Sequence, residues 1–255
     1  MPDSMAAMAV VPMIIRFKSL GVAAQDLDAL AQLTRNHRRI AAGSDIIRAG
    51  QQAKHMSVLI EGLACWYKRL EDGRRRIYTF QHPGDICDLD RFLLPEADDA
   101  ASVQALIECS VAAIDRSDID RLVARKPSLA LAFWRATALD SCILRERLLN
   151  ISAPAVQRVA NLLCEQLARR EAIGLKNPVL ALTQIDVADA CGLSPVHVNR
   201  TIQVLRNLKV LSKSCPIEVV DKRRLADIAR FDGRYLSVSR LSNWTIDVAA
   251  IQRTW

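Results

Sequence analysis

Polar side chains gather on one side of a predicted helix that begins at Ser194 and Pro195. Serine is a favoured helix cap, and proline is favoured at the first helical position. Apolar residues follow at the spacing of one buried face, namely Val198, Ile202 and Leu205. The other face carries imidazole, amide and guanidinium groups, which can form hydrogen bonds with base edges and phosphates. This face therefore predicts contact with DNA.

A shorter predicted helix precedes this one, and a glycine turn separates the two. Thr183 can cap the first helix, with Asp186 three residues later as the matching residue of a capping box. A small residue, a turn glycine and a buried aliphatic residue then follow at the spacing typical of a helix-turn-helix, whose second helix enters the major groove. These three residues are Ala188, Gly192 and Val198. An ordinary helical hairpin in a core is the alternative, and Thr201 favours it because a larger aliphatic side chain would pack better there.

Candidate DNA contacts extend from the first helix to the segment after the second. Arg200 lies on the outward side, where a guanidinium can bind O6 and N7 of guanine. Lys209 and Lys213 lie beyond the helix, so we expect them to contact phosphates. The candidate DNA-binding residues are Thr183, Gln184, Ser194, Pro195, Val196, His197, Asn199, Arg200, Gln203, Arg206, Lys209 and Lys213.

Positive charge is concentrated in the same part of the chain. The 255 residues carry a formal net charge of +7, with 51% hydrophobic and 25% charged residues. Residues 1–151 hold 20 Lys and Arg against 19 Asp and Glu, whereas residues 152–231 hold 12 against 7. A soluble globular chain with this distribution fits a phosphate-binding domain joined to a neutral partner domain.

The spacing of the seven cysteines excludes the common metal-binding motifs. They are more than twenty residues apart, so no Cys-x-x-Cys pair exists for zinc or for an iron–sulfur cluster. We expect reduced, mostly buried thiols in the cytoplasm, and neither a metal nor another cofactor. The apolar run at residues 5–15 is too short to span a bilayer, contains Pro12 and lacks a preceding basic region. We therefore expect neither a signal peptide nor a membrane anchor.

A β-rich region lies in the first half of the chain. Residues 16–39 are predicted to form one or two amphipathic helices that end in a basic cluster at residues 37–39. From residue 40 onward, short β-rich runs alternate with glycine and proline, which predicts a compact antiparallel sandwich or barrel. Asp72-Gly73 between two runs predicts a hairpin turn. The predicted strands lie at residues 46–47, 57–60, 63–67, 76–80, 102–107 and 110–115.

Residues 128–150 are predicted to form one helix of about six turns. Its apolar stripe would suit a coiled-coil seam against a second copy of the chain, and packing against its own barrel is the alternative. The residues predicted for the dimer interface are Leu129, Phe133, Ala136, Leu139 and Ile143. Pro154 then marks a boundary and starts a helix over residues 154–170. A hairpin at residues 212–221 and a closing helix at 222–231 follow, and the remaining residues carry no usable pattern.

A small β-barrel, a long helix and a C-terminal winged helix-turn-helix, in that order, resemble the cyclic-AMP receptor / fumarate-nitrate reductase regulator (Crp/Fnr) family of bacterial transcription factors. The likeness depends on the glycine spacing at Gly62, Gly73 and Gly84 and above all on residues 182–205. It implies an α+β fold and a homodimer that recognises a palindromic operator through the helix at 195–207. RNA polymerase and a small-molecule effector are further candidate partners. The implied domains are a cyclic-nucleotide-binding-like β-barrel (double-stranded β-helix, or jelly roll) at 16–127, a dimerisation helix at 128–151, a winged helix-turn-helix at 152–231 and a tail at 232–255.

The chain departs from the family pattern at two places. Arg200 matches an arginine that most members keep, but Pro195 and Val196 replace an arginine and a glutamate of the cyclic-AMP receptor, so we expect a different DNA sequence to be recognised. In the ligand cassette, Asp99-Ala100 replaces the arginine and serine that bind the cyclic phosphate, and an acidic side chain would repel it. Cyclic AMP is therefore not expected to be the effector. The effector-pocket candidates are Gly84, Asp85, Cys87, Asp88, Asp99 and Ala100.

Three classes of function follow from these patterns. The leading hypothesis is a cytoplasmic, homodimeric, DNA-binding transcription regulator. The second is a small-molecule sensor that acts by protein contact without specific DNA binding, which Pro195 and Val196 favour. An enzyme is disfavoured because the chain has no nucleophile elbow, phosphate loop or paired metal ligands. Redox sensing by Cys87 or Cys191 is a further hypothesis, with buried inert thiols as the alternative.

Overall fold

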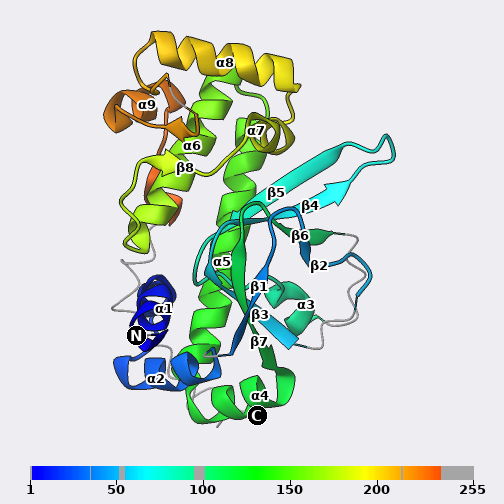
Figure 1. Cartoon of the computed structure of the whole chain (residues 1–255), viewed down its shortest axis with the longest axis vertical. Coiled ribbons are helices and arrows are strands. Elements are labelled where there is room, and N and C mark those ends of the chain that lie inside the picture. The colour runs from blue at the N-terminus through cyan, green and yellow to red at the C-terminus, as the bar shows by residue number, and fades with distance from the viewer. Residues whose placement is uncertain (1, 35, 52–54, 95–100, 214, 237–255) are drawn as a thin grey trace, which may run out of the picture.

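The computed structural model places N-terminal helices, a β domain, one long helix and a C-terminal helical domain in that order along the chain (Figure 1). It describes residues 2–34, 36–51, 55–94, 101–213 and 215–236. The β domain and the C-terminal domain lie at opposite ends of an elongated molecule, and the long helix α5 (Pro127–Asn150) runs between them. Within the described ranges, no helix has the length and apolar character needed to cross a membrane.

Two antiparallel sheets form the β domain. The first has the strand order β1-β7-β3, formed by His37–Ile40, Cys109–Asp115 and His55–Glu61. The second has the order β2-β6-β4-β5, formed by Asp45–Ile47, Ser102–Ala105, Ala64–Arg69 and Arg75–Gln81. Leu59, Val103 and Val111 belong to one buried apolar cluster that draws on both sheets. The predicted antiparallel β architecture is therefore confirmed.

The β4–β5 hairpin turns where the sequence predicts it, and its glycine has the expected backbone conformation. Gly73 has a φ of 79°, in the left-handed region that glycine adopts without steric cost. The basic residues 37–39, by contrast, do not end a helix. They lie in the edge strand β1, where all three are exposed. Charged side chains protect such an edge from pairing with another chain. The helices α3 (Leu89–Leu93) and α4 (Arg116–Arg125) are additions that the sequence patterns do not predict.

Two N-terminal helices pack against the β domain. They are α1 (Pro2–Ser19) and α2 (Ala24–Leu33). Met13 and Phe17 of α1 are completely buried, in a cluster that also contains Met56 of β3 and Ile114 of β7. The predicted helical segment begins only at residue 16, whereas α1 extends back to Pro2. Burial of its apolar side stabilises a helix that Pro12 alone would disfavour.

The long helix α5 is confirmed, but the apolar stripe predicted as its dimer interface faces the core of the protomer. The predicted interface residues are all buried inside the protomer, in the cluster that includes α1, α2 and strands of the first sheet. They are Leu129, Phe133, Ala136, Leu139 and Ile143. An apolar stripe at helical spacing shows that a helix face is covered, but it does not show which element covers it.

The C-terminal domain contains the predicted helix-turn-helix. Its helices are α6 (Ala155–Ala172), α7 (Gln184–Cys191), α8 (Pro195–Asn207) and α9 (Lys222–Ala229), followed by the short 3-10 helix η1 (Gly233–Leu236). The hairpin predicted at 212–221 is only partly present. Its return strand β9 (Ile217–Glu218) pairs with β8 (Val179–Leu180), and Leu211 bridges to Val219.

Ion pairs connect the C-terminal domain to the β domain. Arg75 of β5 pairs with Asp186 and Asp189 of α7 at 2.6 and 2.7 Å. Arg169 of α6 pairs with Asp85, which precedes α3, at 2.7 Å. These side chains are largely buried, so loss of one partner would leave an uncompensated charge. The contacts therefore define how the helix-turn-helix sits on the β domain.

Candidate nucleic-acid interface

Short-range hydrogen bonds build the first helix and the turn of the helix-turn-helix. The amide of Asp186 donates to Oγ1 of Thr183 at 3.1 Å, and the amide of Thr183 donates to Oδ2 of Asp186 at 2.9 Å. This reciprocal pair is the predicted capping box. Gly192 ends α7 with a φ of 64°, again in the left-handed region. These local predictions are confirmed.

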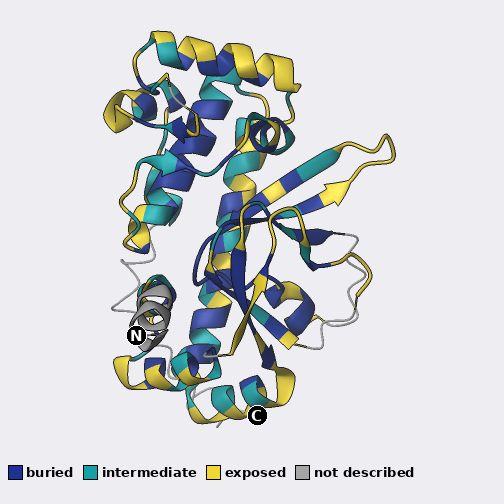
Figure 2. Ribbon diagram, viewed as in Figure 1, coloured by how far each residue is buried: buried dark blue, intermediate teal, exposed yellow. Residues whose placement is uncertain are grey.

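The second helix, α8, separates an inner apolar face from an outer polar face. Val198, Ile202 and Leu205 are completely buried, as the spacing predicts. Thr201 is also buried, and its hydroxyl donates to the carbonyl of His197 at 2.9 Å. An internal hydrogen bond thus satisfies the hydroxyl group of Thr201 at this core position. The outer face remains open to solvent along the end of the molecule (Figure 2).

The structure brings half of the candidate DNA-binding residues together on the exposed outer side of α8. They are Pro195, Val196, His197, Asn199, Arg200 and Gln203. Lys209 and Lys213 are exposed beyond the helix, and Arg206 is half-buried because its Nε donates to the carbonyl of Ser212 at 3.0 Å. Thr183 and Ser194 use their hydroxyl groups as helix caps. Gln184 accepts a hydrogen bond from Asn199 at 3.0 Å, a contact that the sequence does not predict.

A groove of about 530 Å³ follows one side of α8. Its walls come from the start of α6 and from α8, including Pro154, Val156, His197 and Arg200. The basic and polar side chains of α8 therefore border a concave surface as well as projecting from the end of the molecule. This groove leaves one side of α8 accessible from the solvent.

Comparisons with known proteins identify both halves of this architecture. Residues 37–126 match the sequence model of the cyclic nucleotide-binding domain, and residues 157–228 match that of the Crp-like helix-turn-helix domain. The chain belongs to the Crp/Fnr family. It is a DNA-binding transcription regulator of that type.

The similar proteins are themselves described as regulators, not as enzymes. The nitrogen fixation regulation protein FixK of Azorhizobium caulinodans is 30% identical over 182 residues, which cover 68% of this chain and 69% of the relative. The transcriptional activatory protein AadR of Rhodopseudomonas palustris is 27% identical, with 82% and 83% covered. The structure of FixK2 from Bradyrhizobium japonicum has the same fold, with a TM-score of 0.64 and 24% sequence identity. The match covers 76% of this chain and 96% of the FixK2 chain.

The effector-pocket candidates that the structure describes are held by internal contacts in this regulator. Asp85 forms buried ion pairs with Arg16 at 3.0 Å and with Arg169 at 2.7 Å. Burial opposes ionisation, but these two guanidinium groups keep the pKa of Asp85 below its ordinary value. Asp88 accepts a hydrogen bond from the amide of Ser57 at 2.8 Å, and burial raises its pKa to about 7. Gly84 and Cys87 are buried as well, whereas Asp99 and Ala100 lie outside the described residues.

An open cavity of about 480 Å³ lies beside these candidates, between the β domain and α5. Its lining includes Trp66, Tyr78, Asp90, Thr137, Asp140 and Ser141. The sequence patterns miss these residues because they come from β4, β5, α3 and α5, which meet only in the folded chain. Ile86 and Leu89 also line the cavity. In the sequence, Ile86 lies between the candidates Asp85 and Cys87, and Leu89 directly follows Asp88. The predicted segment is therefore close to the cavity, although its acidic side chains at 85 and 88 point elsewhere.

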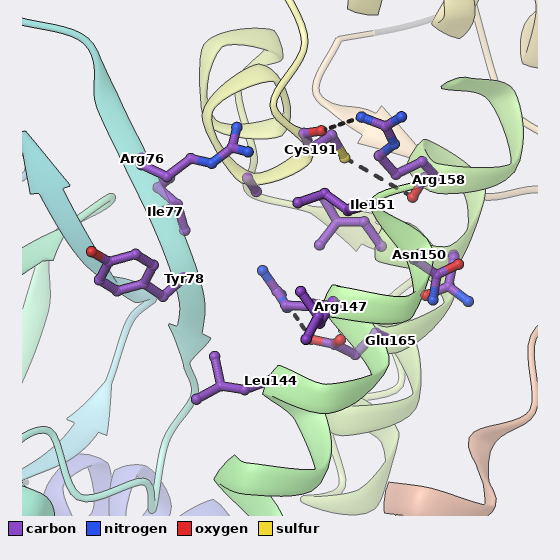
Figure 3. A pocket seen from close by; sticks show the side chains of 14 residues that line it. Arg76, Ile77, Tyr78, Leu144, Arg147, Asn150, Ile151, Arg158, Glu165 and Cys191 are labelled. Atoms are coloured by element: carbon purple, nitrogen blue, oxygen red, sulfur yellow. Dashed lines mark hydrogen bonds and ion pairs between the residues drawn. The ribbon is translucent and has the colours of Figure 1, made fainter. Parts of the chain in front are cut away.

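A second pocket, of about 190 Å³, lies where β5, α5, α6 and α7 meet (Figure 3). Arg147 of α5 donates to Glu165 of α6 at 2.9 Å, and Arg158 of α6 donates to the carbonyl of Cys191 in α7 at 2.8 Å. Arg76 reaches from β5 toward the end of α7. Because the lining comes from both domains, this pocket changes shape if the helix-turn-helix moves against the β domain.

The buried thiols are poor nucleophiles. Burial raises the pKa of Cys191 to about 12 and that of Cys87 well above its ordinary value. A thiolate at either position is therefore disfavoured at neutral pH, which supports the inert alternative to redox sensing. Among the residues that the structure describes, no group of three or more His, Cys, Asp or Glu side chains could hold a metal ion.

Proposed function

We propose that this regulator acts as a homodimer that inserts one copy of α8 into each half-site of a palindromic operator. The exposed polar face of α8 carries this proposal, because it presents Asn199, Arg200 and Gln203 side by side at the end of the molecule. Two such helices related by a two-fold axis meet one side of a duplex when the half-sites lie roughly 34–36 Å apart. Arg200 would bind guanine, and Lys209 and Lys213 would contact phosphates.

The exposed face of α5 supplies the dimer seam in this proposal. Residues spaced alternately by three and four along this face are Trp134, Thr137, Ser141, Leu144, Leu148 and Ile151. The apolar members of this stripe, which we call the α5 seam, are 65% (Trp134), 46% (Leu144), 69% (Leu148) and 50% (Ile151) exposed. A sustained three-four spacing is the pattern of a coiled coil. A second copy packed here would bury these side chains and place the two copies of α8 symmetrically.

The signal that controls the dimer is proposed to differ from cyclic AMP. The cavity beside α5 is lined by Asp90 and Asp140 and by no lysine or arginine among the described residues. Without a lysine or arginine, such a lining gives a cyclic phosphate no oppositely charged partner, and Asp99 likewise replaces such a partner in the cassette. A small-molecule effector of other chemistry and RNA polymerase complete the set of proposed partners. Isothermal titration with cyclic AMP should show no binding, whereas a low-micromolar affinity would contradict this part of the proposal.

One pair of measurements tests the dimer and the operator together. Sedimentation should give the mass of a dimer, and selection from random duplex DNA should return a palindrome whose half-sites are about one turn apart. A monomer that selects a single half-site would contradict the proposal. A dimer that selects no sequence would favour the alternative of a sensor that acts by protein contact.

A further inference from the structure

The side chain of Asn199 is held by the first helix of the helix-turn-helix. Its Nδ2 donates a hydrogen bond of 3.0 Å to Oε1 of Gln184, the first residue of α7. Asn199 is exposed and Gln184 is half-buried. The bond therefore joins two helices at the surface that faces DNA in the proposed complex.

This bond determines which hydrogen-bonding groups Asn199 still presents. An asparagine amide has two N–H donors and one carbonyl oxygen. Gln184 occupies one donor, so the second donor and Oδ1 stay available. Rotation of the amide by half a turn would exchange its oxygen and nitrogen and place Oδ1 against Oε1 of Gln184, where two acceptors repel. With its own amide oriented as in the structure, Gln184 thus favours one of the two orientations of the Asn199 amide.

The available pair of groups matches one base edge in the major groove. Adenine presents an acceptor at N7 and a donor at N6, which an asparagine amide can bind with both groups at once. Guanine presents two acceptors at N7 and O6, so the carbonyl of Asn199 would face another acceptor there. Thymine and cytosine each lack the adjacent acceptor and donor of the adenine edge.

The position of Asn199 on the helix suits base contact. It is the fifth residue of α8, within the N-terminal half that contacts base edges in helix-turn-helix complexes. It directly precedes Arg200, and it follows Val196 by one helical turn. The exposed side chain of Val196 can form no hydrogen bond with a base edge. Discrimination between bases near Val196 therefore depends on its polar neighbours.

On the basis of the proposed DNA contact of α8, we propose that Asn199 recognises one adenine in each half-site and that Gln184 is its positioning residue. Each half-site would then contain an adenine bound by Asn199 close to the guanine bound by Arg200. Neither role requires a change in the fold, because Asn199 is exposed and Gln184 is only half-buried.

The test compares base preferences, measured by selection from random duplex DNA and by competition with single-base variants of the selected site. The wild type should prefer adenine at one symmetric pair of positions, and Asn199→Ala should lose about 5- to 140-fold of discrimination there and nowhere else. Asn207→Ala is the matched control, since it changes the same residue type at the exposed C-terminal end of α8 and should leave every preference intact. Asn199→Ser provides a second variant with a small polar side chain.

Variants at Gln184 separate positioning from simple support of the fold. Gln184→Ala should weaken the adenine preference at the same position. Gln184→Glu keeps an oxygen acceptor for Asn199, so it should keep the preference while its charge lowers affinity evenly across sequences. Replacing the selected adenine by 7-deazaadenine, which lacks the N7 acceptor, should weaken the wild type and leave Asn199→Ala unaffected.

Three results would overturn the inference. A uniform loss of affinity in Asn199→Ala, with all preferences retained, would make Asn199 a phosphate contact. An unchanged adenine preference in Gln184→Ala would remove the positioning role. A wild-type protein that selects no sequence at all would overturn the proposed operator recognition and, with it, this inference, whereas the first two results leave that proposal standing.

Discussion

Arg200 and Lys213 carry the same charge in different surroundings, so their loss should affect DNA binding differently. Arg200 lies on α8 beside the groove, whereas Lys213 is exposed after the helix. We expect Arg200→Ala to cost about 1–3 kcal/mol per half-site and to relax the preference at one base pair. Lys213→Ala should weaken binding evenly and reduce the salt dependence by roughly one unit per contact. Binding of both variants to a panel of operator variants at several salt concentrations distinguishes the two. An equal, uniform loss in both would make Arg200 a phosphate contact.

At the same scale, Asp140 should make the stability of the protein depend on pH. Burial, together with the negative charge of Asp85, raises the pKa of Asp140 to about 7 from an ordinary value of 3.8. In the unfolded chain the carboxyl ionises near pH 4, whereas in the folded chain it resists ionisation up to about pH 7. The protonated carboxyl therefore contributes fully to the free energy of unfolding below the pKa that it has in the unfolded chain. This contribution is lost as the pH rises through the higher pKa that the group has in the folded chain.

Asp140→Asn cannot ionise, so it should gain stability relative to the wild type as the pH rises from about 4 to 7 and level off above. Urea unfolding of both proteins across this range measures the difference directly, and the other titrating groups cancel in it. A difference that stays constant with pH would show that Asp140 ionises normally in the folded protein.

At the scale of the element, α5 has two faces with different tasks. One face packs inside the protomer, and the α5 seam remains exposed. Leu148→Glu should therefore weaken self-association without unfolding the protomer, because Leu148 is 69% exposed. Leu149→Glu is the matched control, since Leu149 is 71% exposed but lies outside the three-four spacing of the seam. Sedimentation equilibrium should show dissociation only in the first variant. Equal dissociation constants for the two variants would place the interface elsewhere.

At the scale of the whole molecule, Arg75 couples the β domain to the helix-turn-helix. Besides its two carboxylate partners on α7, its Nη1 donates to Gln104 of β6 at 2.7 Å. Arg75→Gln would leave Asp186 and Asp189 without this cation, which should cost on the order of 3 kcal/mol and loosen α7 from the β domain. Hydrogen exchange should then accelerate in α7 and α8 more than in the sheets. Arg74→Gln serves as the control, because Arg74 is exposed and pairs with Asp72 in the same hairpin. Unchanged exchange in Arg75→Gln would show that apolar contacts alone hold the domains together.

Local interactions explain which features could be predicted from the sequence. The Thr183–Asp186 capping box, the left-handed Gly192 and the turn at Gly73 depend on neighbours a few residues away. The buried face of α8 depends only on helical period. These features, and with them the helix-turn-helix and its exposed polar side, follow from the order of residue types because no distant part of the chain is needed to form them.

Features that depend on distant partners were decided by the tertiary structure. The apolar period of α5 is the same whether a second copy or the β domain covers it, and the fold assigns Leu129 and Ile143 to the protomer core. The cavity beside α5 combines side chains from four elements, and Arg75 meets Asp186 across 111 residues of sequence. Gln184 and Asn199 lie only 15 residues apart, yet their contact depends on the angle between α7 and α8. A single sequence specifies hydrophobic period and caps directly, but the partner that each surface meets depends on how all the elements pack together.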